Sequence, residues 1–143
     1  MRFENELDID RETKAIKIFC EKFKATYTKL GENDIDFCVK REDKICYVEV
    51  KGRNRNLIDA YPLPLAARKM IKLVDKGHQS IIIWDCHDVI IYGNTKDLIA
   101  QGKMGGRPPR KGSFNDKEYM LYFEKQDGLL YIEKDLIKFV DGN

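Results

Sequence analysis

The chain has 143 residues, a length that fits one domain with a sizeable hydrophobic core. Hydrophobic residues make up 43% of the chain and aromatic residues 10%, which is ordinary for a globular protein. Charged residues make up 35%, but they balance to a formal net charge of +2, so only local clusters can argue for an acidic partner. The longest apolar runs are too short to span a bilayer, and the acidic start is not that of a signal peptide.

The cysteines give no sign of a zinc site or of a disulfide framework. None of them forms a CxxC pair, and each lies among apolar or strand-like neighbours. They are Cys20, Cys38, Cys46 and Cys86. We therefore expect four small buried side chains in a reducing compartment, and hence a cytoplasmic protein without membrane contact.

A first helix is expected to begin near Arg11, with Asp10 as its cap. Apolar residues then recur at helical spacing and predict one buried side. They are Ala15, Ile16, Phe19, Cys20 and Phe23. Glu12 falls on this same stripe, where a lone carboxylate is out of place, although the helix dipole also favours an acid in a first turn.

A strand over residues 26–30 and a turn over 31–33 lead to two more strands, at about 35–40 and 45–51, which form a hairpin around residues 41–44. If Lys40 faces Ile45, paired residue numbers sum to 85. Phe37 then faces Val48 and Ile35 faces Val50, so the apolar faces of the two strands coincide. Ile35, Phe37 and Val39 are expected on that apolar face.

The opposite face of this hairpin would place two carboxylates side by side. In the same register Asp36 faces Glu49, with the Cβ atoms ~5 Å apart. Two carboxylates at that distance repel unless a cation lies between them, and oxygen ligands of this kind suit Mg²⁺. Lys51, two residues after Glu49, shares its face. The simpler alternative is a surface salt bridge on a half-exposed sheet.

The second half of the chain predicts a helix from the prolines at 62 and 64 to Gly77, and then strands at 80–84 and 89–92. The helix would bury Ala66, Ala67, Met70, Leu73 and Val74. Its other side would carry Arg68, Lys69, Lys72 and Lys76. A short helix is predicted at 95–100, a loop at 101–113, a strand pair at 118–124 and 129–132 with its turn at 126–128, and a final short helix.

The order Glu12, Asp36 and then Glu49-Val50-Lys51 resembles the PD-(D/E)xK nuclease superfamily, in particular its archaeal-type Holliday junction resolvases and compact phage nucleases. Ile35 stands where the superfamily name has proline. The resemblance implies an α/β fold with a restriction-endonuclease-like mixed sheet flanked by helices. It covers residues 11 to about 85 and assigns no role to residues 86–143, where the residue pattern alone predicts a C-terminal β-hairpin and short helix. Residues 1–143 would form a single nuclease domain, with its core at about 11–92 and a C-terminal elaboration at about 93–143.

By this resemblance the protein would be a Mg²⁺- or Mn²⁺-dependent endonuclease on DNA, specific for junctions, flaps or single strands, as in DNA repair or recombination. Asp36, Glu49 and the Val50 carbonyl would bind the metal, with Glu12 reaching it directly or through water. Lys51 would orient the attacking water. RNA as substrate and a homodimer as the assembly both stay open.

Basic residues beyond the hairpin are candidate phosphate contacts, although solvated surface charge is the simpler interpretation for each. The candidates are Arg53, Arg55, Lys69, Lys103, Arg107, Arg110 and Lys111. Two other functions remain: a catalytically silent relative that only binds nucleic acid, and a protein-interaction domain whose acids are plain surface charge.

Overall fold

Two β-sheets and two α-helices make up the part of the chain that a computed structural model describes, which is residues 6–31, 35–77, 79–106 and 117–134. The larger sheet has six strands in the order β1-β2-β3-β5-β6-β9. Their bounds are β1 Thr26–Lys29, β2 Phe37–Arg41, β3 Lys44–Gly52, β5 Gln79–Asp85, β6 Val89–Asn94 and β9 Leu130–Lys134. Only β3 and β5 run parallel in this sheet, so it is the mixed sheet that the resemblance implied.

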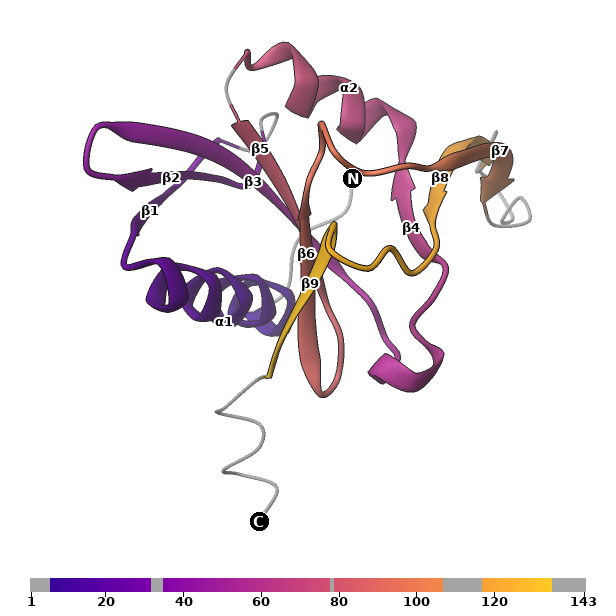
Figure 1. Cartoon of the computed structure of the whole chain (residues 1–143), viewed down its shortest axis with the longest axis horizontal. Coiled ribbons are helices and arrows are strands. Elements are labelled where there is room, and N and C mark those ends of the chain that lie inside the picture. Colours follow the sequence, from indigo (N-terminus) through magenta and orange to yellow (C-terminus); the bar gives the residue numbers. More distant parts are fainter. Residues whose placement is uncertain (1–5, 32–34, 78, 107–116, 135–143) are drawn as a thin grey trace.

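The faces of the six-stranded sheet are covered by different elements, as Figure 1 shows. Helix α1 (Glu6–Phe23) packs on one face. The other face meets α2 (Ala67–Asp75) and a second sheet in the order β4-β8-β7. The bounds of that sheet are β4 Leu63–Ala66, β7 Gln101–Gly106 and β8 Lys117–Phe123, and a 3-10 turn, Leu57–Asp59, precedes β4.

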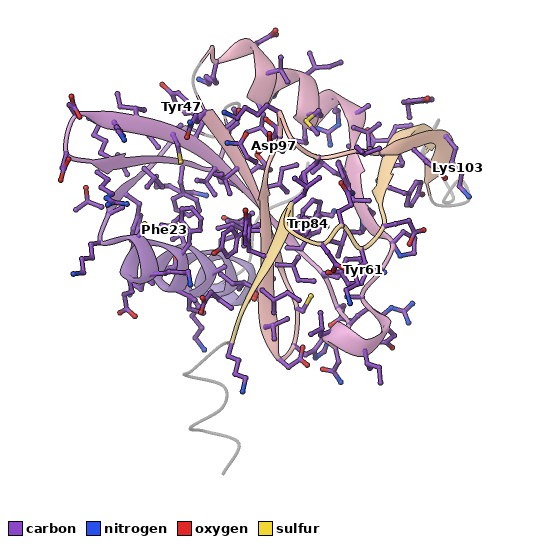
Figure 2. All side chains as sticks on the ribbon, viewed as in Figure 1. Phe23, Tyr47, Tyr61, Trp84, Asp97 and Lys103 are labelled. Carbon is purple, nitrogen blue, oxygen red and sulfur yellow. The ribbon has the colours of Figure 1, made fainter. Side chains whose placement is uncertain are left out.

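Strand β5 lies between two hydrophobic cores, and its successive side chains point alternately into one and the other. Ile83 belongs to the core under α1, whereas Ile82 and Trp84 belong to the core under α2 and the second sheet. The Trp84 indole donates a hydrogen bond to the Pro64 carbonyl at 2.8 Å and packs against Phe123, with ring centroids 5.3 Å apart. Trp84 therefore joins the two sheets, and Figure 2 shows it between them.

Helix α1 buries the side that the sequence predicted. Ala15, Ile16, Phe19 and Cys20 are buried, while Phe23 is partly buried. The expected start near Arg11 is wrong, because the helix begins at Glu6 and Asp10 lies inside it. The acidic residues before Arg11 suit the first turns of a helix, where its dipole favours negative charge, so they extend the helix instead of preceding it.

The hairpin of β2 and β3 has the predicted register, since Phe37 pairs with Val48 and Lys40 pairs with Ile45. The expectation for Ile35 is wrong. The regular pairing begins at Phe37, and Ile35 packs with the α2 side of the sheet, away from Phe37 and Val39. A bend at Asp36 causes this change of face.

The helix was expected to start at the prolines at 62 and 64, and this expectation is wrong. Pro64 lies in β4, which among the described strands pairs only with β8, and such an edge strand tolerates a residue without an N–H donor. Helix α2 then begins at Ala67. It buries Leu73, but Val74 is 61% exposed, so its expected burial is also wrong.

The last third of the chain departs most from the expectation. Residues 95–97 form a turn, in which the Asn94 side chain accepts a hydrogen bond from the Lys96 N–H, and residues 98–100 are irregular, so the expected helix at 95–100 is absent. The expected loop begins instead with β7. The expected C-terminal hairpin is not formed, because β8 pairs with β4 and β7 whereas β9 pairs with β6. The final helix falls at 135–143, outside the described residues, as does most of the turn at 31–33.

Neither helix of the described residues combines the length and apolar character that crossing a membrane requires.

Candidate active site

Asp36 occupies the bend just before β2 and is tied to the next strand. Its Oδ2 atom accepts a hydrogen bond from the Val50 N–H at 2.8 Å. Its backbone carbonyl accepts a second one, from the Leu30 N–H at 3.0 Å. The Asp36 side chain therefore takes the place of the backbone pairing between β2 and β3, which begins only at Phe37. Its hydrogen bond with the Val50 N–H holds Asp36 beside Glu49.

Glu49 is a buried carboxylate in the middle of β3, with its side chain only 7% exposed. Burial raises the pKa of Glu49 to about 7, and the neighbouring Asp36 carboxylate contributes to this rise, while Lys69 opposes it. Its Oε1 atom has no hydrogen-bond partner, although buried polar atoms are almost always satisfied. Such an atom next to a second carboxylate indicates a position where a cation would be stabilised.

A lysine from β1, Lys29, lies between Glu12 and this pair of carboxylates. The ammonium of Lys29 lies 2.9 Å from Glu12 Oε2 and 4.0 Å from Asp36 Oδ1. It also lies over the Phe37 ring, 5.0 Å from the centroid. The chain reverses its direction directly after α1. Lys24 has a positive φ of 54° there, and the Ala25 N–H donates a hydrogen bond to the Cys20 carbonyl. Because of this reversal, β1 runs back along the helix and brings Lys29 to Glu12.

Two further lysines lie near Glu49. Lys51, on the same face two residues later, is exposed near the end of β3. Lys69 comes from the first turns of α2, and its ammonium lies 3.5 Å from Glu49 Oε2. The basic side of α2 is therefore not all solvent-facing: Lys69 is 27% exposed and contacts the candidate site, whereas Arg68 pairs with Glu118 of β8 at 3.0 Å.

The residues at this site fit a hard divalent cation. Mg²⁺ is commonly bound by one or two carboxylates and completes its shell with waters, and Asp36 and Glu49 offer that donor set with one buried oxygen unsatisfied. No group of three His, Cys, Asp or Glu side chains in the described parts of the chain lies close enough to hold a metal ion. A direct bond from Glu12 and one from the Val50 carbonyl therefore stay predictions.

The predicted phosphate contacts lie in different environments. Arg53 is partly buried and donates to the Ala60 carbonyl at 2.8 Å, so it supports the connection between β3 and β4. Arg55 is exposed and lies 3.9 Å from Asp59. Lys103 lies over the Tyr122 ring on β8, and Figure 2 shows it at the far end of the second sheet from Tyr47 of β3. Arg107, Arg110 and Lys111 lie outside the described residues.

Lys29 is the residue of this site that the sequence analysis missed. The signal was present, because the pairing of β1 with β2 places Lys29 opposite Phe37 and so next to Asp36. Extending the register from the hairpin to the strand before it would have found this residue.

Comparison with known proteins gives a family for the chain and a solved structure of similar fold. The model of the family described as phage putative PDDEXK endonuclease matches residues 1–128. The structure is similar to Hjc from Archaeoglobus fulgidus, a Holliday junction resolvase from an archaeal hyperthermophile, with a TM-score of 0.52 and 12% sequence identity over 81% of this chain and 88% of that one. A search of curated proteins found no match.

Proposed function

The chain belongs to the phage putative PDDEXK endonuclease family, and from this membership we propose that it is a divalent-metal-dependent endonuclease that hydrolyses phosphodiester bonds in DNA. The observation that carries the proposal is the buried Glu49 carboxylate, which lies beside Asp36 with one oxygen unsatisfied and Lys51 two residues along the strand. This is the arrangement that the hydrolysis of a phosphodiester needs: a place for a cation and a nearby ammonium.

The residues of the site would divide the work as follows. Asp36 and Glu49 would hold Mg²⁺ or Mn²⁺, which when bound lowers the pKa of a water and stabilises charge on the phosphate. Lys51 would hydrogen-bond the attacking water and a phosphate oxygen, and so orient the water in line with the ester bond that breaks. Glu12 would act on the site through Lys29 or through water.

Branched DNA is the finer substrate class that we propose to test first, because a protein of similar fold acts on Holliday junctions. Cleavage of a four-way junction requires two cuts, so a junction activity would also require two copies of this chain. Arg55, Lys103 and the basic residues Arg107, Arg110 and Lys111 remain our candidates for contacts to the DNA backbone. We place the whole chain in one nuclease domain that acts inside the cell, where four free thiols persist.

The test is a cleavage panel with Mg²⁺ or Mn²⁺ over single-stranded, duplex, flap and four-way-junction DNA. Lys51→Ala should abolish cleavage and keep DNA binding. Lys44→Ala is the matched control, since Lys44 is also an exposed lysine of β3 but lies at its far end, next to the hairpin turn. Wild-type protein that cuts none of these substrates with either metal would refute the proposal, and binding without cutting would support the catalytically silent alternative.

A further inference from the structure

Lys29 contacts two of the three carboxylates of the site at once. Its ammonium is 2.9 Å from Glu12 Oε2 and 4.0 Å from Asp36 Oδ1. The other oxygen of Asp36, Oδ2, already accepts the Val50 N–H. The carboxylate oxygens between Glu12 and Asp36 therefore face a positive charge that the chain itself supplies.

The other side of Asp36 is different. There Glu49 Oε1 is buried and has no hydrogen-bond partner, and Lys69 approaches the other Glu49 oxygen. A cation placed between Asp36 and Glu49 would satisfy the unpaired atom. A cation placed between Asp36 and Glu12 would have to displace the Lys29 ammonium or lie against it.

The charges of the site also favour a cation between Asp36 and Glu49 over one between Asp36 and Glu12. The three carboxylates Glu12, Asp36 and Glu49 carry three negative charges, and the ammonium groups of Lys29 and Lys69 offset two of them. Lys51, on the same face as Glu49, adds a third positive charge, so one divalent ion already makes the site net positive, which a DNA phosphate can balance. A second ion, ~4 Å from the first as in two-metal sites, would add to that positive charge beside the Lys29 ammonium.

We propose that Lys29 is a positioning residue that takes the place of a second metal ion, holding Glu12 and Asp36 in register and limiting the site to a single divalent cation between Asp36 and Glu49. This inference rests on the proposed function, since it assumes that a divalent ion binds at this site. It assigns Glu12 an indirect role, as the partner of Lys29 and not as a ligand of the metal.

The experiment measures the number of Mn²⁺ ions bound per chain by calorimetry at about pH 8 without DNA, where Glu49 is mostly ionised. Wild-type protein and Lys29→Arg, which keeps the cation, should bind one ion. Lys29→Met should bind two, with the first bound about fivefold more tightly because a neighbouring positive charge is gone. Adding Glu12→Gln to Lys29→Met should return the number to one.

A second readout distinguishes this role from that of an ordinary ion pair. Two Mn²⁺ ions ~4 Å apart couple magnetically, so Lys29→Met should show a spin-coupled resonance spectrum that the wild type lacks. The matched control is Lys22→Met. Lys22 is also an ion-paired lysine of similar exposure, 44% against 46% for Lys29, but its partner is Glu133 of β9, outside the site. Lys29→Gln repeats the test with a polar side chain in case the Met variant does not fold.

The outcomes separate this inference from the proposed function. If Lys29→Met and Lys29→Gln still bind one ion while the wild type binds one and cuts DNA, the inference is overturned and the function stands. A wild type that binds two ions also overturns it. A wild type that binds none overturns both.

Discussion

The proposed chemistry depends on the Glu49 carboxylate, whose burial destabilises the metal-free fold when the group is ionised. Its pKa rises from 4.5 to about 7 because of burial and of Asp36. For an acid, a raised pKa means that the folded state holds the proton more tightly than the unfolded state. The stability associated with Glu49 is therefore greatest below pH 4.5, falls as the pH rises toward 7 and stays low above it.

The substitution Glu49→Gln removes the loss of folding stability that the ionisation of Glu49 causes. In the absence of metal we expect the variant to gain stability over the wild type between pH 5 and pH 8, by up to ~3 kcal/mol. The free energy of unfolding measured by urea denaturation at both pH values checks this, and Glu21→Gln, on the exposed side of α1, should stay within about 0.5 kcal/mol of wild type at both. Addition of Mg²⁺ should stabilise the wild type and not Glu49→Gln; an equal effect on both would contradict the assignment of Glu49 as a ligand.

Lys69 opposes the effect of burial on Glu49, and its removal should change metal binding in a pH-dependent way. In Lys69→Met the pKa of Glu49 should rise further, because the ammonium 3.5 Å from its carboxylate is lost. Mn²⁺ should then bind about threefold more tightly at pH 8.5, because a neighbouring positive charge is gone, and the gain should be smaller at pH 6.5, where protons compete for Glu49. Calorimetry at the two pH values measures this.

Arg68→Met is the matched control for Lys69. Arg68 is the preceding residue of α2, and its guanidinium pairs with Glu118 and not with the site. Its loss should leave Mn²⁺ binding unchanged at both pH values. Weaker Mn²⁺ binding in Lys69→Met at pH 8.5 would mean that Lys69 supports the fold of the site and does not act through the ionisation of Glu49.

At the scale of elements, the hairpin could be predicted from the sequence, and the partners of the strands near the end of the chain could not. The register of β2 and β3 follows from a short turn and from apolar residues that match pair by pair, so local information determines it. The partners of β8 and β9 lie far away in the chain, and two strands separated by a turn signal at 126–128 gave a false hairpin. Asp36 and Glu49 could thus be paired in advance, whereas the contact of Lys69 with Glu49 depends on how α2 packs.

Helix α2 provides a direct test of which side packs against the sheet. Leu73 is fully buried in the core with Ile82 and Trp84, whereas the next residue, Val74, is 61% exposed. Leu73→Ala should lower the free energy of unfolding by about 2–5 kcal/mol, and Val74→Ala by less than about 0.5 kcal/mol. Denaturant unfolding of both variants compares them, and similar losses would mean that α2 is rotated from the orientation described.

Leu73→Ala should also weaken cleavage if it lets α2 move, because Lys69 is positioned by the same helix. Activity per folded molecule, measured well below the unfolding midpoint, separates this effect from the loss of folded protein. The Val74→Ala protein should keep full activity.

At the scale of the whole molecule, the two sheets depend on each other through the core that contains Trp84. Residues from β4, β8 and β9 complete this core, so strands on both sides of residue 92 contribute to it. The family match, which continues to residue 128, covers β4 and β8 and ends before β9. Trp84 is the single tryptophan of the chain and reports on the contact between the sheets.

Phe123→Ala should therefore destabilise the entire protein and not only β8. The Phe123 ring is fully buried against Trp84, so its truncation leaves a cavity that should cost about 3–5 kcal/mol of unfolding free energy. Trp84 fluorescence and far-ultraviolet circular dichroism should follow one common transition, shifted to lower urea in the variant. Lys125→Ala, at a side chain 69% exposed, is the control and should leave that transition in place. A Phe123→Ala protein in which the fluorescence changes early while the dichroism and Mn²⁺ binding persist would show that the six-stranded sheet folds without the second sheet, and that the nuclease core is separable from the rest of the chain.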